Sequence, residues 1–270
     1  MKILLNINDL NKAISKVANL GFVPTMGMLH KGHISLIKKS QKKCKKTLVS
    51  IFVNPNQFNN NNDFKKYPRN INRDLKILKK LKVDFVFLPK KKEIYKKKFK
   101  KIKLNKSEKI LCAKFRKGHF EGVLDVMRQF FKLIKAKYTF MGKKDYQQVY
   151  LIKKYLSKKY KRKILICPTV RNKNKLALSS RNFLLNKKDI NKASLISSNL
   201  LKFSSILKKS IKFKTNLIYN KKIELEKKYN IKIEYLELKN EKNLDQITKN
   251  TNNILFVAYY LKKIRLIDNY

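Results

Sequence analysis

Residues 47–54, TLVSIFVN, are an almost continuous apolar run. A short run without alternation is typical of a β-strand buried on both faces of a sheet. Similar runs occupy residues 21–25, 83–89, 138–142 and 164–170. Apolar residues at helical spacing precede or separate these runs at 8–19, 33–44, 71–81, 121–135 and 146–157. The alternation predicts an α/β fold with a parallel sheet covered by helices.

Residues 170–270 show a different pattern. They contain two long helical stretches at 187–209 and 214–229, an alternating stretch at 231–239 and a final pair of elements near 254–267. This pattern predicts a smaller α+β domain. We expect the boundary near residue 170, where the polar stretch RNKNK begins.

The charge of the chain is strongly unbalanced. Its 270 residues include 68 Lys and Arg against 17 Asp and Glu, a formal net charge of +51 at pH 7. Such an excess indicates nucleic-acid or anionic-membrane binding when the cations gather on one face or in one tail. Here lysine is spread over nearly every predicted helix and most loops, and Asn and Ile are also abundant. We interpret the charge as an effect of AT-rich codons and expect no specific nucleic-acid partner.

Cysteine usage and hydropathy indicate the compartment. Cys44, Cys112 and Cys167 are far apart and match neither a Cys-x-x-Cys pair nor a zinc-site spacing. The N-terminal apolar run is shorter than the core of a signal peptide, and no apolar stretch of about 18 residues follows. We therefore expect a soluble, cytoplasmic protein that does not associate with membranes.

Polar side chains follow the predicted strands. VPTMGMLHKGH (23–33) begins within the first strand, and NPNQF (54–58) follows the second. GKKDYQQ (142–148) and LALSSRN (176–182) follow later strands. Because such sheets bind ligands beyond the carboxyl ends of their strands, we expect these segments to form one site.

The first segment holds two of the three histidines, His30 and His33. Gly27 and Gly32 permit a tight turn, and a helix beginning at His33 would offer free N–H groups to a phosphate chain. Histidines three positions apart lie on one side of a helical turn and could donate hydrogen bonds to phosphate oxygens. Two other interpretations stay open: zinc ligation, although no third ligand lies nearby in the sequence, and a purely structural role.

The other segments are weak signals when each is taken alone. Asn54 and Gln57 suit the hydroxyl or carboxylate of a small polar substrate, but they could equally be turn residues. The SSR stretch at 179–181 could clamp a phosphate. Lys144 could hold phosphate and Asp145 ribose or a metal, although a single Lys means little in so basic a chain.

Together, the segments resemble the pantothenate synthetase (pantoate–β-alanine ligase) family of the HxGH nucleotidyltransferase superfamily. The resemblance spans nearly the whole chain and rests on VPTMGMLHKGH, SIFVNPNQF with YPR, GHFEGV, GKKDYQQ, LALSSRN and the closing RLIDN. It implies a Rossmann-like domain for nucleotide and pantoate (1–169), a C-terminal lid domain (170–270) and a homodimer. It also implies ATP-dependent condensation of (R)-pantoate with β-alanine to pantothenate, through pantoyl adenylate, with release of AMP and pyrophosphate.

The resemblance also implies residue roles. His33 would be the proton donor, with His30 beside it on the phosphates. The ATP site would comprise Met26, Gly27, Met28, Leu29, His30, Lys31, Gly32, His33, Gly142, Lys143, Lys144, Asp145, Val170, Leu178, Ser179, Ser180 and Arg181. Substrate contacts would come from Gln57 (pantoate and β-alanine) and Gln148 (pantoate), supported by Asn54 and Tyr67. Mg²⁺ would be carried mainly by the ATP phosphates, and the sequence identifies no metal ligands.

Four positions depart from the family pattern. Lys31 stands where an acidic residue is usual, and Lys143 stands where Glu is usual. In the GHFEGV helix, Asp125 replaces an expected Thr and Gln129 an expected Lys. Asp125 would oppose a substrate carboxylate unless it points away from the pocket.

Two other functions compete with this interpretation. A relative that transfers a nucleotide to another small acid or phosphate would share the HxGH segment, but it would not need NPNQF and DYQQ together. A basic nucleic-acid-binding protein would bind strands tightly at low salt whether or not ATP is present.

Overall fold

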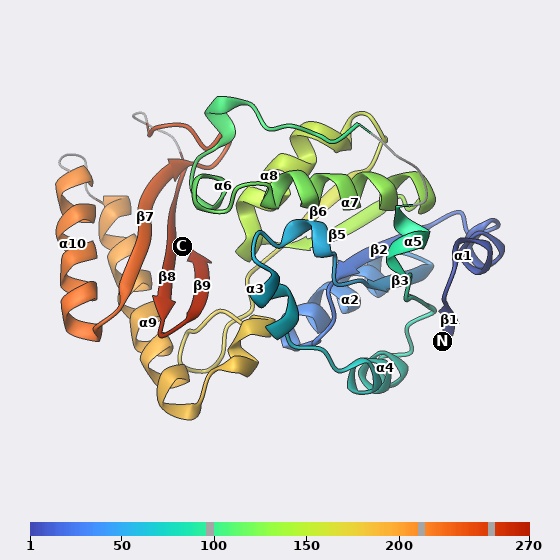
Figure 1. Cartoon of the computed structure of the whole chain (residues 1–270), viewed down its shortest axis with the longest axis horizontal. Helices are drawn as coiled ribbons and strands as arrows, with labels where there is room; N and C mark the ends of the chain where they lie inside the picture. The colour runs from blue at the N-terminus through green and yellow to red at the C-terminus, as the bar shows by residue number, and fades with distance from the viewer. Residues whose placement is uncertain (96–99, 210–213, 248–251) are drawn as a thin grey trace. The chain divides into compact units, whose positions relative to one another are not determined.

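The computed structural model of the chain describes residues 1–95, 100–209, 214–247 and 252–270. Contacts divide the chain into two compact units, Met1–Pro168 and Thr169–Tyr270. Figure 1 shows the helices and strands of both units in chain order. No helix among the described residues is long and apolar enough to cross a membrane.

The first unit contains a six-stranded sheet. Its strands are β1 (Lys2–Leu4), β2 (Leu20–Thr25), β3 (Lys46–Ile51), β4 (Phe85–Phe87), β5 (Tyr138–Gly142) and β6 (Lys163–Cys167). They lie in the order β1-β4-β3-β2-β5-β6, and every neighbouring pair is parallel. The predicted parallel sheet is confirmed, and β1 is an additional edge strand whose three residues are too short to show a period.

The chain changes direction across this sheet between β2 and β5. From β2 it proceeds through β3 and β4 on one side, whereas β5 and β6 lie on the other side. The connections that leave the carboxyl ends of β2 and β5 therefore diverge, which opens a crevice in folds of this kind. The segments after Thr25 and after Gly142 border that position.

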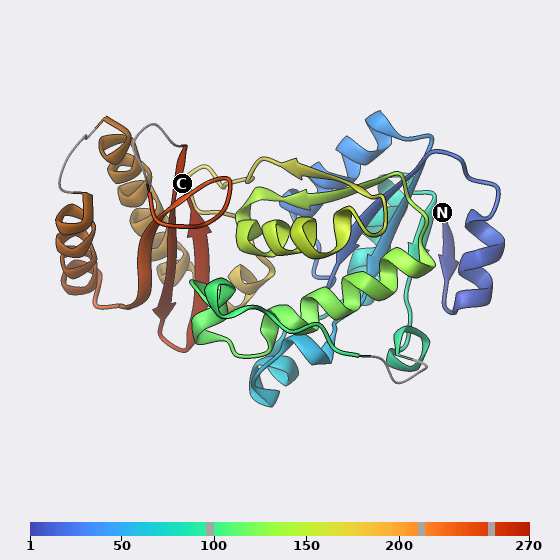
Figure 2. The ribbon, with the colours of Figure 1, turned by 90° about the horizontal axis from the view of Figure 1, so that it is seen from above.

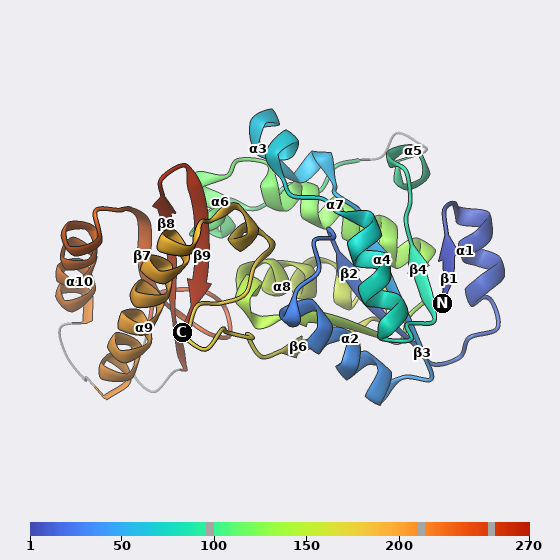
Figure 3. The same cartoon turned by 90° about the horizontal axis from the view of Figure 1, so that it is seen from below.

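Helices cover both faces of the sheet. The helices of the first unit are α1 (Ile7–Ile14), α2 (Lys31–Lys43), α3 (Asn61–Lys66), α4 (Ile71–Lys80), α5 (Lys91–Ile94), α6 (Cys112–Phe115), α7 (His119–Leu133) and α8 (Tyr146–Ile152). Figures 2 and 3 show α2 and α4 on one face and α7 and α8 on the other. The predicted helix at 146–157 is α-helical only to Ile152, because residues 153–157 form a π-helical turn.

Alternation along the strands explains this two-sided packing. Val23 and Val49 belong to a buried cluster that includes Leu36 of α2 and Leu78 of α4. The neighbouring Phe22 points to the opposite face, since side chains alternate along a strand, and its ring contacts a ring of α7. Strands buried on both faces need apolar residues at every position, which is what the continuous runs indicated.

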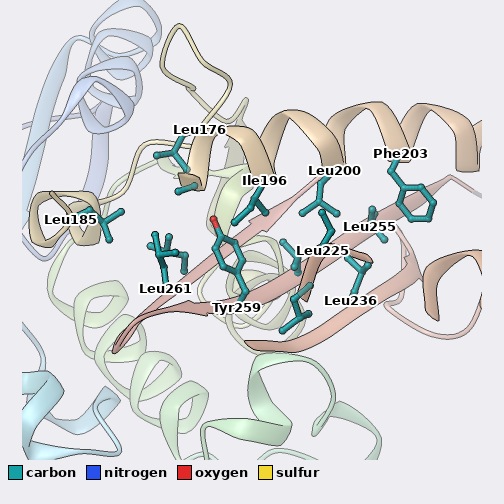
Figure 4. Close-up of a cluster of buried hydrophobic side chains, with 14 of the residues drawn as sticks. Leu176, Leu185, Ile196, Leu200, Phe203, Leu225, Leu236, Leu255, Tyr259 and Leu261 are labelled. Atoms are coloured by element: carbon teal, nitrogen blue, oxygen red, sulfur yellow. The ribbon is translucent and has the colours of Figure 1, made fainter. Parts of the chain in front are cut away.

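The second unit pairs three strands with two helices. Strands β7 (Lys232–Asn240), β8 (Asn253–Leu261) and β9 (Ile264–Asn269) form an antiparallel sheet in that order. Helices α9 (Lys187–Lys209) and α10 (Lys214–Tyr229) match the predicted bounds. Figure 4 shows Ile196, Leu200 and Phe203 of α9 facing the apolar side chains of the sheet. This small α+β unit agrees with the expected class.

Candidate active site

The loop after β2 is held in an unusual backbone conformation. Gly27 has φ +80° and Met28 has φ +53°, a region that side chains with a Cβ rarely adopt. A Cβ on Gly27 would lie 3.0 Å from Asp74 Oδ2. The Asp74 carboxylate accepts the N–H of Met28 and the N–H of Leu29, each at 2.7 Å. The loop is therefore clamped from α4.

Sequence reasoning missed this clamp. Asp74 is 1% exposed, and the neighbouring Arg73 donates to the Leu29 carbonyl at 3.0 Å. The available signal was a carboxylate on the inward side of a helix, four positions before the buried Leu78. Buried carboxylates need partners, and here the partners are the N–H groups of the candidate phosphate loop.

His30 and His33 cap the helix that follows this loop. Helix α2 begins at Lys31, so the prediction that it begins at His33 was wrong by two residues. The physical reason is that His30 acts as the N-cap: its Nδ1 accepts the Gly32 N–H at 3.1 Å. His33 Nδ1 accepts the His30 N–H at 3.4 Å, and the ring centroids lie 4.1 Å apart.

This capping decides the protonation of both rings. A nitrogen that accepts an N–H carries no proton, so the proton of each neutral ring sits on Nε2. Burial lowers the pKa of His30 to about 3, and the adjacent His33 ring and the Lys144 cation further disfavour its charged form. Burial and Lys144 lower the pKa of His33 to about 4. At neutral pH both rings are uncharged and offer an Nε2–H donor.

The segment after β5 brings a cation to these rings. Lys144 lies close enough to influence both histidines and also binds Asp145 Oδ1 at 3.2 Å. A Cβ on Gly142 would meet no atom within 4 Å, so the absence of a side chain there leaves open space. The Lys143 Nζ lies over the Tyr146 ring, 5.9 Å from the ring centroid. Lys31 is exposed at the first turn of α2.

Asn54 organises the segment after β3. Its Nδ2 donates to the Gly122 carbonyl at 3.1 Å, and its Oδ1 accepts the Asn56 N–H at 3.2 Å and the Tyr95 hydroxyl at 2.9 Å. A carbonyl can only accept and a backbone N–H can only donate, so these partners determine which end of the amide is which. A Cβ on Gly122 would lie 2.1 Å from the Asn56 carbonyl oxygen, and only glycine lets α7 approach this turn.

A hydrogen bond from Asn54 orients the side chain of Gln57. Asn54 Nδ2 also lies 3.3 Å from Gln57 Oε1, which leaves Gln57 Nε2 pointing away, 2.8 Å from Met26 Sδ. The Gln57 carbonyl accepts His119 Nδ1–H at 2.7 Å and Arg116 Nη2–H at 3.5 Å. Gln57 thus presents an amide donor toward Met26 and the loop that follows β2.

The two glutamines of DYQQ differ in environment. Gln147 is buried and bonds the Ile110 carbonyl at 2.8 Å and the Cys112 N–H at 3.1 Å. Gln148 is half-buried, and its side chain makes no hydrogen bond to the residues that the structure describes. Tyr67 is buried and packs edge-on against the Phe58 ring.

Asp125 points to a partner of its own. Its Oδ1 accepts from Arg128 Nη2 at 2.8 Å and from the Ile102 N–H at 3.2 Å. Arg128 Nη2 also donates to the Lys100 carbonyl at 2.8 Å. The departure from the family pattern is therefore compensated, because the carboxylate is neutralised by Arg128 on the same helix. The structure brings nothing to Gln129 that accounts for its replacement.

The remaining predicted ATP residues belong to the second unit. Val170 and Leu178 are half-buried and joined by a backbone hydrogen bond of 2.9 Å. Ser179 caps the 3₁₀ turn of residues 180–184 by accepting the Arg181 N–H at 3.3 Å. Ser180 is 7% exposed. Two backbone N–H groups of residues 178–181, those of Leu178 and Arg181, are therefore already bonded within the second unit.

The closing RLIDN motif supports this segment. Both oxygens of Asp268 bind Arg171, at 2.6 and 3.0 Å. Arg171 also donates to the Lys175 and Asn269 carbonyls, at 3.0 and 3.1 Å. Asp268 thereby fixes the turn of residues 171–175 that leads to Ser179. These bonds of Asp268 lie within the second unit, and the sequence motif assigns no role to this residue.

Metal ligands are not gathered in the described part of the chain. Within it, no group of three or more His, Cys, Asp or Glu side chains is placed to hold a metal ion. The alternative of zinc ligation by His30 and His33 finds no third ligand among those residues. Each Nδ1 is also occupied by a backbone N–H.

Sequence relatives match the whole chain. The family model for pantoate-beta-alanine ligase covers residues 2–270. The pantothenate synthetase of Pseudothermotoga lettingae is 37% identical over 276 residues, covering 100% of this chain and 98% of the relative. That of Buchnera aphidicola subsp. Schizaphis graminum is 40% identical over 282 residues, with the same two coverages.

Solved structures agree with the sequence relatives. The pantoate-beta-alanine ligase of Francisella tularensis, crystallised with beta-gamma ATP and beta-alanine, superposes with a TM-score of 0.84 at 37% identity, covering 100% of this chain and 97% of that one. The pantothenate synthetase of Thermus thermophilus gives 0.91 at 29% identity, covering 100% and 99%. The chain belongs to the pantoate-beta-alanine ligase family.

Proposed function

We propose that this protein condenses (R)-pantoate with β-alanine in two steps. ATP and pantoate first give pantoyl adenylate and pyrophosphate, and β-alanine then attacks the acyl carbon to give pantothenate and AMP. A carboxylate acylates poorly, and adenylation converts one of its oxygens into part of a good leaving group. The site needs to align the reactants and stabilise phosphate charge, and no covalent nucleophile is required.

The observation that carries this proposal is the pair of capped histidines beside Lys144. His30 and His33 are neutral Nε2–H donors at the N-terminus of α2, where the helix dipole favours an anion. Lys144 supplies a positive charge next to them. Donors held in place before the reaction stabilise the charge that develops on the phosphates during adenylation. The open space at Gly142 leaves room for the nucleotide.

The side-chain amides of the two glutamines predicted to bind pantoate fit the same proposal. Gln57 presents Nε2–H, which suits an acceptor such as a hydroxyl or carboxylate oxygen of pantoate. Gln148 would provide the second pantoate contact from α8. In the F. tularensis ligase, beta-gamma ATP and beta-alanine are bound together, and we assign both ligands to this chain by family membership.

Mg²⁺ belongs to the proposal as a companion of ATP. The described residues hold no three-ligand cluster for it, and Mg²⁺ is commonly bound through substrate phosphates and water. When present, it would neutralise phosphate charge. From membership of the family we also propose that residues 170–270 act as a lid, that the protein assembles as a homodimer and that it acts in the cytoplasm.

A pyrophosphate-exchange assay tests the function. With ATP, Mg²⁺ and pantoate but no β-alanine, labelled pyrophosphate should exchange into ATP only when pantoate is present. Addition of β-alanine should release AMP and pantothenate. His33→Ala should lower the exchange rate at least about a hundredfold, the effect expected for loss of a transition-state donor. Folded protein that shows neither exchange nor AMP release would refute the proposal.

The exchange assay together with a strand-binding assay separates the competing functions. A transferase for another small acid or phosphate would exchange pyrophosphate with that substrate and not with pantoate. A nucleic-acid-binding protein would bind strands without ATP and lose this binding steeply as salt rises.

A further inference from the structure

Leu111 has a backbone conformation that leucine rarely adopts. Its φ is +49° and its ψ is −128°, which corresponds to the first central position of a type II′ turn, usually occupied by glycine. The Leu111 side chain is 1% exposed and packs in the apolar core, although its backbone conformation favours glycine. Such a conformation persists only when the surroundings hold it in place.

The holding group is the side-chain amide of Gln147. Its Nε2 donates to the Ile110 carbonyl at 2.8 Å, and its Oε1 accepts the Cys112 N–H at 3.1 Å. These are the two peptide groups that meet at Leu111. The Gln147 amide thus fixes the peptide planes on both sides of Leu111. Only a side chain that carries a donor and an acceptor next to each other can do this.

The Leu111 turn determines where the next segment lies. Helix α6 starts at Cys112, and the Arg116 N–H bonds the Cys112 carbonyl at 2.9 Å. Arg116 Nη1 lies 2.9 Å from His119 Nε2. Both side chains donate to the carbonyl of Gln57. A shift at Leu111 would therefore move the groups that hold Gln57.

Gln147 also neighbours Gln148 on α8. We propose that Gln147 is a positioning residue, whose amide stabilises the strained Leu111 turn and so sets the spacing of Gln57 and Gln148 for pantoate. This inference rests on the proposed function. Gln147, the first glutamine of DYQQ, would then support pantoate binding without contacting the substrate, whereas Gln148, the second, would contact pantoate.

The test is Gln147→Glu, which keeps the size of the side chain and removes the donor. At about pH 8.5 the carboxylate repels the Ile110 carbonyl, and the KM for pantoate should rise at least about tenfold. At about pH 6 a carboxyl group whose pKa is raised by burial regains its proton and can donate again, so the KM should return toward the wild-type value. The KM for ATP should stay within about twofold of the wild type at both pH values, because the loop after β2 is held by Asp74.

Two further variants complete the design. Gln147→Leu removes both hydrogen bonds and should raise the KM for pantoate at both pH values. Gln41→Glu is the matched control, because Gln41 Nε2 donates to the Leu81 carbonyl at 2.7 Å and not to a peptide group of the Leu111 turn. It should leave the KM for pantoate unchanged.

Several results would overturn the inference. One is an unchanged KM for pantoate in folded Gln147→Glu at the higher pH; another is a parallel rise in the KM values for pantoate and ATP. If neither Gln147 variant folds, the amide is needed for folding and the positioning role is refuted. Wild-type protein without pantoate-dependent exchange would refute the proposed function instead, so the two failures are distinguishable.

Discussion

At the scale of single residues, hydrogen-bond partners determine which ring nitrogen of each histidine carries the proton. His30 and His33 accept backbone N–H groups at Nδ1, whereas His119 Nδ1 faces the Gln57 carbonyl and must donate. The sequence shows that HxGH holds two histidines, but only the folded backbone shows that both are Nε2–H donors.

These assignments can be measured by long-range ¹H–¹⁵N NMR of the ring nitrogens, since the chain has three histidines. Two rings should show the Nε2–H tautomer at neutral pH, and the ring of His119 should show the Nδ1–H tautomer. His33→Gln and His30→Gln assign the signals. An Nδ1–H tautomer at His30 or His33 would contradict the donor role, and a charged ring there at pH 7 would contradict the lowered pKa.

The lowered pKa values predict a pH dependence of stability. The folded pKa values are about 3 for His30 and about 4 for His33, against 6.5 in the unfolded chain. The unfolded chain therefore binds more protons below about pH 6.5, and the free energy of unfolding should fall from there toward about pH 4. Urea midpoints should fall between about pH 7 and 5, and less steeply in a variant with Gln at both positions. Equal slopes would refute this origin.

Asn54 offers a second test at this scale. In Asn54→Asp, one oxygen keeps the Asn56 N–H and the Tyr95 hydroxyl, but the other faces the Gly122 carbonyl and Gln57 Oε1. Gln57 should then turn its Nε2 toward the new carboxylate and away from the substrate. We expect the KM for pantoate to rise about tenfold or more, with little change in the KM for ATP. Steady-state kinetics with each substrate varied would show this, and an unchanged KM for pantoate would refute it.

At the scale of elements, α4 matters to the site through the loop that it clamps. The apolar period predicted a helix at 71–81, but the pairing of Asp74 with Met28 and Leu29 joins residues 45 and 46 positions apart. Spacing arguments work within an element and cannot identify such a partner. The helix start at Lys31 was missed for a related reason, because histidine is not among the usual N-caps.

Asp74→Asn should loosen this loop. An amide has one acceptor oxygen, so either Met28 or Leu29 would lose its partner and face an NH₂ group instead. We expect the free energy of unfolding to fall by about 2 kcal/mol and the KM for ATP to rise. Asp9→Asn, at a half-buried carboxylate outside the loop that accepts the Leu5 N–H at 3.3 Å, should change neither. Urea denaturation and ATP kinetics measure both effects.

At the scale of the whole molecule, the net charge of +51 is the dominant electrostatic fact. Like charges on a compact surface repel, and dissolved ions screen this repulsion. We therefore expect low stability at low ionic strength and a melting temperature that rises by several degrees as salt is added. A midpoint that stays flat or falls would show that the charges are already balanced locally. Sulfate should act more strongly than chloride at equal ionic strength, because it is also excluded from protein surfaces.

Patterns along the sequence are sufficient to predict the class of the fold and most helices and strands, and the sequence motifs predict the segments of the candidate site. Continuous apolar runs and helical periods depend on neighbours along the chain, so they are readable without a structure. Which atoms those segments present depends on the folded chain. Asp74, Gln147 and Arg128 acquire their roles from partners distant in sequence or set by the fold. A hydrogen bond depends on the distance and direction between its donor and acceptor. For residues far apart in the sequence, this geometry is set only when the chain folds.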